Sequence, residues 1–373
     1  MRLSFTESDS RRGTIDMNSS LELLRILAMT FIVASHCSMH CFLPGGGSKY
    51  PINDSFYYWS ALGNLGVDLF LLLSGYFLCD KQNPRKNLKK LWVQVLFYSI
   101  LGTVIWLATG HALEGHMISQ ALFPATFDTY WFFTAYIIFV LLSPFLNTLI
   151  RNLRKEQHLS LIFVMLLFWS VLPSIAGRDT DREIMSQFLL FYLMGSYFKR
   201  HPDNLFSRAR FRNLTCLICF FLLFLSSTVS YHYGEYLGVF SRPPLFYYSR
   251  SSVLAVGCTV SLFAIFAYHK EFHKSIINLL GSCMFGVYLL HDHPLMRVAI
   301  WQEWLVKWDY YHTLQYIPYC LFSVALVMAA GILMELIRKA LIAEPMLKAA
   351  DYVISLFLST SKKLAAPVLK KIH

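Results

Sequence analysis

Long apolar runs separated by shorter polar stretches dominate the chain. The runs fall near residues 22–42, 57–79, 91–109, 130–150, 159–176, 184–199, 214–231, 249–268, 276–292 and 314–337. A bilayer core is crossed by about 20 consecutive apolar residues in a helix, and most of these runs have that length. The runs at 184–199 and 276–292 are shorter and are interrupted by glycine. The pattern predicts an all-α membrane protein with about ten transmembrane helices.

Composition agrees with the pattern. The chain is 56% hydrophobic and 16% aromatic, and its mean hydropathy is +0.47. These values are too high for a soluble domain of 373 residues. No stretch is long and polar enough to form a second, soluble catalytic domain. The cysteines lie mostly within the apolar runs, so a disulfide framework is not expected.

Basic residues are distributed very unevenly between alternate loops. Of the 33 Lys and Arg residues, 25 fall in the terminal segments and loops on one side and seven in the loops on the other, with Arg25 inside the first run. Loops rich in Lys and Arg stay in the cytoplasm. We therefore expect an even number of spans with both termini cytoplasmic, in the inner (cytoplasmic) membrane. This bias also explains the net charge of +11 without a nucleic-acid partner.

The apolar runs suggest three segments. Residues 1–20 are predicted to be a cytoplasmic N-terminal segment, because the first apolar run follows about 20 polar residues and has no signal-peptide cleavage pattern. Residues 21–340 are predicted to form the transmembrane domain. Residues 341–373 mix lysines with apolar residues and are predicted to be a basic amphipathic tail on the cytoplasmic membrane surface.

Two polar residues inside the first run point to chemistry. Ionisable groups within a membrane span are costly, and they usually face a cavity where they have a function. Arg25 and His36 are eleven positions apart, which in an α-helix is about three turns plus 20°, so both lie on one face about 16 Å apart along the axis. This places Arg25 near a membrane surface and His36 near mid-bilayer.

The segment from Asn18 to Arg25, followed by His36, resembles the opening of the acyltransferase 3 family, the integral membrane O-acyltransferases of bacterial surface glycans. An arginine, ten intervening residues and a histidine are the hallmark of that family's first helix. Further segments resemble family motifs in the same order: residues 66–70, 74–76, 130–136 with Ser143 and Pro144, and 280–291. The resemblance covers roughly residues 18–340. The chain departs from the pattern in having Glu22 where aspartate is more usual, and we do not expect any of its stretches to form the extracytoplasmic esterase-like domain that some members carry.

The resemblance implies transfer of an acyl group, acetyl in the first instance, from cytoplasmic acyl-CoA to a hydroxyl of a cell-surface glycan or lipid-linked sugar. It assigns Arg25 and His36 as essential to the transfer. Arg25 suits the donor phosphates because a guanidinium stays charged and binds phosphate bidentately. Lys81 and Arg85, in the basic loop on the same side, could assist. His36 suits general-base catalysis because an imidazole takes and returns a proton near neutral pH.

Other residues are weaker candidates, each with a structural alternative. Asp68 could orient His36 as a catalytic partner, or it could be a structural carboxylate. Ser74, followed by Gly75, could let a thin ligand pass, or these small residues could serve tight helix packing. Trp131 and Tyr136 could stack on a sugar, or belong to an aromatic belt. His291, at the outer end of the ninth run, could meet the acceptor, or be part of an interfacial cluster.

The residues also raise two alternatives, a metal site and a transporter function. His36 and His40 form one i, i+4 pair and Cys37 and Cys41 another, but the pairs point about 100° apart, so four ligands cannot converge on one ion. We expect no metal. A transporter whose buried Arg, His and Asp line a pathway is the alternative function, and it would move an intact solute instead of consuming a thioester.

Overall fold

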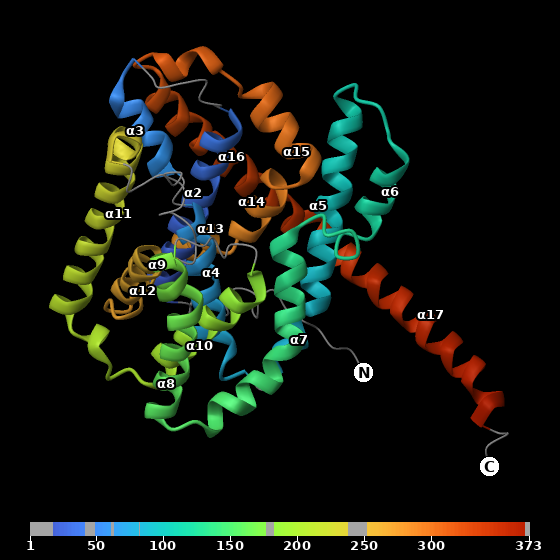
Figure 1. Cartoon of the computed structure of the whole chain (residues 1–373). Coiled ribbons are helices and arrows are strands. Elements are labelled where there is room, and N and C mark those ends of the chain that lie inside the picture. Colours follow the sequence, from blue (N-terminus) through green and yellow to red (C-terminus); the bar gives the residue numbers. More distant parts are fainter. Residues whose placement is uncertain are drawn as a thin grey trace.

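The computed structural model describes residues 18–41, 49–60, 63–81, 83–176, 183–237 and 252–369 (Figure 1). Helices make up most of the described residues, and no strand occurs among them. The main helices are α2 (Ser19–Cys41), α3 (Pro51–Ser60), α4 (Gly63–Leu78), α5 (Leu88–Ala108), α6 (Gly115–Leu122), α7 (Trp131–Asn152), α8 (Lys155–Leu166), α9 (Leu172–Ala176), α10 (Ile184–Arg200), α11 (Ala209–Leu237), α12 (Val253–Ala267), α13 (Ser275–Gly281), α14 (Met284–His291), α15 (Pro294–Val298), α16 (Tyr316–Ile337) and α17 (Ala343–Leu369).

Every range predicted as a span contains helix, but the helices do not all have the length of a span. Among the described residues, six helices are long and apolar enough to cross a membrane, or seven if the bent unit from Ser275 to Trp304 is one span. The helices α4 and α12 are apolar but shorter. The range 57–79 is shared by α3 and α4 and is not one helix. The chain is therefore a helical membrane protein, while the count of ten and the orientation of the termini stay predictions.

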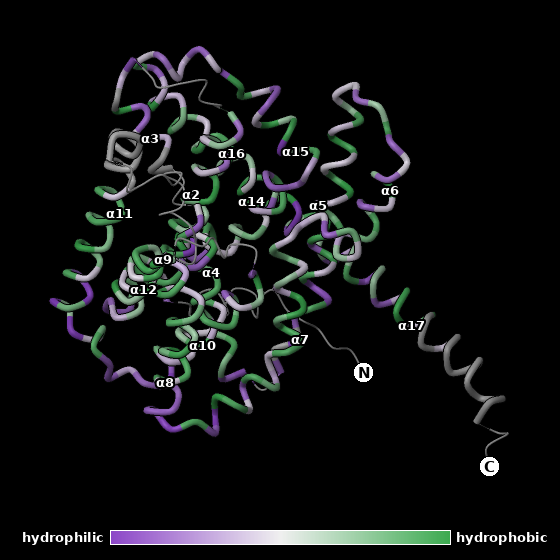
Figure 2. Tube along the Cα trace, in the orientation of Figure 1, coloured by the Kyte–Doolittle hydropathy of each residue, from purple (hydrophilic) through white to green (hydrophobic). Residues whose placement is uncertain are grey.

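Hydropathy follows the helices as a bilayer requires. Figure 2 shows hydrophobic residues along the outer helices and hydrophilic residues gathered at the loops, for example where α7 turns into α8 and below α11. Large apolar side chains on these helices are exposed, including Phe145, Phe163 and Leu217, at 69%, 63% and 68%. Exposure of this extent would be unfavourable in water, so these faces are the lipid-facing surface.

The helix α4 lies in the centre, packed between α2 and α10 (Figure 1). Its contact with α10 depends on a reciprocal pair of glycines. A Cβ atom on Gly75 would lie 2.4 Å from the carbonyl oxygen of Tyr192, and one on Gly195 would lie 2.2 Å from that of Leu72. Any side chain at either position would force the helices apart. Close packing therefore accounts for Gly75 without a passing ligand.

The predicted span 276–292 is a broken helix. It divides into α13 and α14 at Ser282 and Cys283, and the chain then bends by 83° into α15 and the π-helical segment that follows it. His293 stabilises the new direction, because its Nδ1 accepts a hydrogen bond from the backbone N–H of Leu295. Helix breaks within a membrane domain occur where the freed backbone lies inside the protein. This bend places Asp292 in the interior, 1% exposed.

The last span runs without a break into the tail. A π-helical turn, Arg338–Ile342, joins α16 to α17, which leaves the bundle (Figure 1). The domain boundary expected at residue 340 thus falls within a continuous helix. Lys89 on α5 forms an ion pair of 2.5 Å with Asp351 and ties the first part of α17 to the bundle.

Candidate functional site

Arg25 opens onto a cavity of about 340 Å³ between α2, α4, α5, α7 and the break between α13 and α14. We call it the Arg25 cavity. Polar groups line it on several sides: Arg25, Ser74, Lys81, Gln94, Tyr136 and Ser282. Apolar side chains from the same helices complete its walls. Four of the residues expected to bind the donor or the acceptor thus share one space.

The charge at this cavity is positive and is held in place. The Arg25 guanidinium pairs with Glu22 one turn earlier, and it lies 5.0 Å above the Phe77 ring. Glu22 is 1% exposed, so the salt bridge is closed to solvent on one side, whereas 25% of the Arg25 side chain stays accessible. In the loop after α4, partial desolvation lowers the pKa of Lys81, and the nearby Arg25 charge lowers it further. A bound anion would relieve this repulsion.

His36 faces a second, smaller space of about 50 Å³, which we call the His36 cavity. Its walls come from α2, α4, α7 and α14 and are apolar apart from three polar residues: Trp131, Tyr288 and Asp292. Met29 and Ile32 lie between Arg25 and His36 on the same face of α2 and line this cavity too. The two cavities therefore follow one helix face, as the spacing of Arg25 and His36 indicates.

His36, Asp292 and Arg297 form a row of three contacting polar side chains. The Nδ1 atom of His36 lies 3.6 Å from Oδ1 of Asp292, which also accepts a hydrogen bond of 2.6 Å from Arg297. The imidazole keeps 22% of its surface accessible, whereas the carboxylate is only 2% exposed. His36 can therefore meet a ligand in the cavity while Asp292 acts on it from behind. A carboxylate in this place can orient the imidazole ring.

Two more histidines lie beside His36. The ring of His291 is 5.0 Å away, centroid to centroid, and that of His40 is 5.7 Å away. His291 is fully buried, and its Nδ1 lies 2.6 Å from the Val287 carbonyl oxygen. It packs against the His36 ring inside the bundle, whereas an acceptor was expected to meet it at the outer end of the span. Among the described residues, no group of three or more His, Cys, Asp or Glu side chains is arranged to hold a metal ion.

Three expected site residues line neither cavity: Asp68, Arg85 and His291, which is described above. Asp68 is fully buried in α4, but the carboxylate that faces His36 is Asp292. Arg85 donates a hydrogen bond of 2.8 Å to the carbonyl oxygen of Leu141 and does not line the Arg25 cavity. Trp131 and Tyr136 are divided between the His36 cavity and the Arg25 cavity, so they do not form one stacking platform.

Sequence reasoning missed the roles of Asp292 and Tyr288. Asp292 directly follows His291 at the end of a predicted span, and the 83° bend that turns it inward has no clear sequence signal. Tyr288 lines the His36 cavity, and its buried hydroxyl makes no hydrogen bond of normal geometry with a described residue. A hydroxyl of a residue that lines the same cavity as His36 can donate to a developing negative charge.

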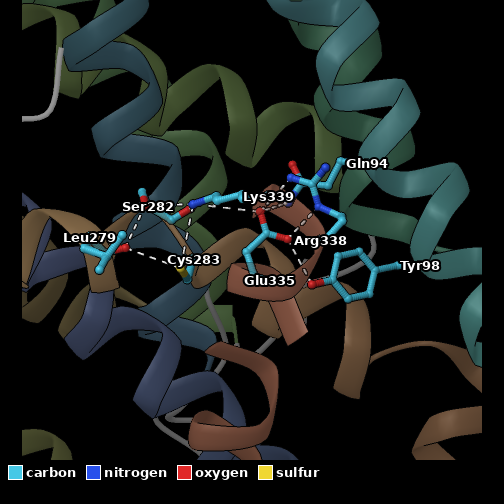
Figure 3. A network of polar contacts seen from close by, with 8 residues as sticks. All are labelled: Gln94, Tyr98, Leu279, Ser282, Cys283, Glu335, Arg338 and Lys339. Atoms are coloured by element: carbon cyan, nitrogen blue, oxygen red, sulfur yellow. Dashed lines mark hydrogen bonds and ion pairs between the residues drawn. The ribbon is translucent and has the colours of Figure 1, made fainter. Parts of the chain in front are cut away.

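Sequence reasoning also missed a polar network behind the Arg25 cavity (Figure 3). Glu335 on α16 accepts hydrogen bonds from Gln94 and Tyr98 on α5, at 3.1 and 2.9 Å. It also accepts two from Arg338, at 2.8 and 2.7 Å. Lys339 donates to the Ser282 carbonyl and hydroxyl oxygens at the break after α13. The sequence signal that could have revealed this network is Glu335, an acidic residue within the apolar run 314–337.

This network fixes the wall of the Arg25 cavity. Gln94 and Ser282 both line the cavity and both belong to the network. Glu335 is fully buried, and its charge is matched by Arg338 next to it. Buried charges with several hydrogen bonds hold their elements in one arrangement. The network therefore joins α5, α16 and the break between α13 and α14 where the cavity opens.

Comparison with protein families agrees with this geometry. The model of the acyltransferase 3 family, described as an acyltransferase domain, matches residues 18–335, most of the chain and all of the residues that line the two cavities. Neither the curated proteins nor the solved structures include a match. The matched region begins one residue before α2 and ends at Glu335. The chain belongs to the acyltransferase 3 family.

Proposed function

We propose that this protein is an inner-membrane O-acyltransferase that moves an acetyl group from cytoplasmic acyl-CoA to a hydroxyl of a cell-surface glycan or lipid-linked sugar. The observation that carries the proposal is the pair of neighbouring cavities on one face of α2, with a cationic mouth at Arg25 and a base at His36. Family membership supports acyl transfer as the reaction. The donor, the acetyl group and the acceptor are our inference.

The Arg25 cavity fits the donor. Arg25 and Lys81 provide two positive charges for phosphate groups, and the guanidinium can bind them bidentately. From Arg25 to His36 the helix rises about 16 Å. The extended pantetheine arm of coenzyme A has a comparable length, so phosphates held at Arg25 would leave the thioester close to His36. This arrangement would bring donor and base together before the acceptor arrives.

The His36 cavity fits the chemical step. His36 takes the proton of the acceptor hydroxyl as its oxygen attacks the thioester carbonyl carbon, and a new C–O bond forms. The C–S bond then breaks, and His36 returns the proton to the departing thiolate, which leaves as coenzyme A. Asp292 stabilises the imidazolium between these two transfers. Tyr288 lines the same space, and we assign its hydroxyl as the donor to the oxyanion.

A reconstitution experiment tests this proposal. The purified protein in lipid nanodiscs would be given acetyl-CoA and a hydroxyl acceptor, and the release of free coenzyme A thiol would be followed together with the mass of the acceptor. We expect thiol release that depends on the acceptor, with the acceptor heavier by one acetyl group. No thiol release with any sugar acceptor tested would contradict the proposal.

The transporter alternative gives a different result in the same preparation. Sealed vesicles containing a transporter would accumulate an unmodified solute when a gradient is applied, and acetyl-CoA would stay intact. The buried Arg25, His36 and Asp292 are compatible with a solute pathway, but family membership favours acyl transfer. Uptake of unmodified sugar without loss of the thioester would show that the protein is a transporter and not an acyltransferase.

A further inference from the structure

Three phenylalanines separate the Arg25 cavity from the His36 cavity. Phe70, Phe132 and Phe285 are common to the walls of both, and they come from α4, α7 and α14. We call them the phenylalanine collar. A donor held at Arg25 has to reach past the collar in order to present its thioester to His36. Its side chains are partly buried, as expected of residues that border two spaces.

Neighbouring aromatic rings hold the collar. The Phe132 ring packs against Tyr136, Phe188 and Tyr288, with centroids 6.0, 5.5 and 5.8 Å apart. The Phe285 ring stacks on Tyr288 at 5.9 Å. Aromatic pairs at these distances add stability beyond simple burial. Because Tyr288 contacts two members of the collar, the constriction and the wall of the His36 cavity form one packed unit.

Little space lies beyond the collar. The His36 cavity measures about 50 Å³, and a water-sized group needs roughly 10–15 Å³ measured in this way. The cavity therefore has room for about four such groups. An acetyl group fits this space beside the attacking oxygen. A hexanoyl group, with four more methylenes, does not, unless the surrounding side chains move. Forcing extra methylenes into a packed apolar space is unfavourable.

We propose that the phenylalanine collar sets the acyl-chain length of the donor, admitting acetyl and excluding medium-chain acyl groups. This inference rests on the proposed function, since it assumes that acyl-CoA is the donor. It adds the residues that select the donor: Phe70, Phe132 and Phe285 act by their volume and take no part in proton transfer. A methylene that a tight apolar pocket cannot accommodate changes kcat/KM by about 10–200-fold.

The test is a chain-length series on collar variants. Purified wild type, Phe132→Ala and Phe285→Leu would be assayed for kcat/KM with acetyl-, butyryl- and hexanoyl-CoA. Phe285→Leu is the milder change and covers the case in which Phe132→Ala does not fold. The matched control is Phe139→Ala on the same helix as Phe132. Phe139 is 3% exposed, packs against Phe188 and Tyr192 and lines neither cavity.

We expect the wild type to prefer acetyl-CoA over hexanoyl-CoA by at least tenfold. In each collar variant that ratio should fall by tenfold or more, because hexanoyl-CoA gains, while Phe139→Ala keeps the wild-type ratio. A ratio unchanged in both collar variants, or shifted equally in Phe139→Ala, would overturn the inference and leave the proposed function standing. A wild type that consumes none of the three thioesters would instead overturn the proposed function.

Discussion

The imidazole Nδ1 of His36 lies 3.6 Å from the carboxylate Oδ1 of Asp292. One residue is near the end of α2, and the other follows α14 where the chain bends by 83°. Arg297, in the short helix after the bend, holds the same carboxylate oxygen at 2.6 Å. The carboxylate is therefore held by Arg297 and faces the His36 ring. The bend places this carboxylate beside the His36 ring.

The first prediction separates Asp292 from Asp68. Asp292→Asn removes the charge beside His36, and we expect the rate of acyl transfer to fall about 10²–10⁴-fold, within the range for disabling a general base. Coenzyme A affinity should stay near the wild-type value, because Asp292 does not line the Arg25 cavity. The measurements are steady-state kinetics and coenzyme A titration on Asp292→Asn and Asp68→Asn. A larger loss in Asp68→Asn than in Asp292→Asn would return the role of catalytic partner to Asp68.

The second prediction concerns Tyr288. Tyr288→Phe removes a hydroxyl and keeps the ring that packs against Phe132 and Phe285. If the hydroxyl donates to the oxyanion, kcat should fall about 10²–10³-fold with little change in KM for the donor. Tyr130→Phe is the control: the Tyr130 hydroxyl is also buried, but it donates to the Leu289 carbonyl oxygen at 3.0 Å. Equal rates in Tyr288→Phe and the wild type would exclude Tyr288 as the oxyanion donor.

The third prediction concerns Arg25 as the phosphate ligand. Arg25→Lys keeps the charge but loses the planar pair of donors, so it should weaken coenzyme A binding less than Arg25→Ala does. Binding should also weaken as salt rises, because part of the Arg25 side chain is exposed. Isothermal titration with coenzyme A at several salt concentrations measures both effects. Arg85→Ala is the control, since Arg85 lies outside the cavity. Identical affinities in all four proteins would remove Arg25 from the donor site.

The fourth prediction concerns stability. Glu335→Ala leaves the buried Arg338 without its partner and also removes an acceptor from Gln94 and Tyr98. Breaking a buried ion pair in this way costs about 3–5 kcal/mol, and the thermal unfolding temperature should fall clearly. Glu344→Ala is the matched control, because Glu344 and Lys348 form an exposed pair on α17. A similar fall in both variants would mean that the network does not stabilise the bundle.

Much of the helical architecture could be predicted from apolar runs, because bilayer thickness fixes the length of a span. Spacing along one helix also placed Arg25 and His36 on one face, since both belong to the uninterrupted α2. What the pattern could not give was contact between distant helices. The range 57–79 reads as one apolar run, yet it divides between α3 and α4.

The site shows the same division between local and long-range information. Asp68 was the expected partner of His36 because its depth, estimated from loop positions, matched. Depth says nothing about the direction in which a side chain points around the bundle. Asp292 reaches His36 only through the bend after α14. Glu335 reaches Gln94 and Tyr98 only because α16 and α5 both pack against α14. The phenylalanine collar could not be predicted from the sequence, because its members come from three different helices that meet only in the folded protein.

The central claim is that His36 is the base of an acyl transfer to a glycan, and mass spectrometry of surface glycans tests it most directly. Cells lacking the protein would be complemented with wild type, His36→Ala or, as a control, His40→Ala, with equal membrane levels verified by immunoblot. His40 is the neighbouring histidine on α2 but does not line the His36 cavity. We predict acetylated glycan with wild type and His40→Ala, and at least a 10²-fold loss with His36→Ala. Acetylation at the wild-type level in cells carrying His36→Ala would contradict the account.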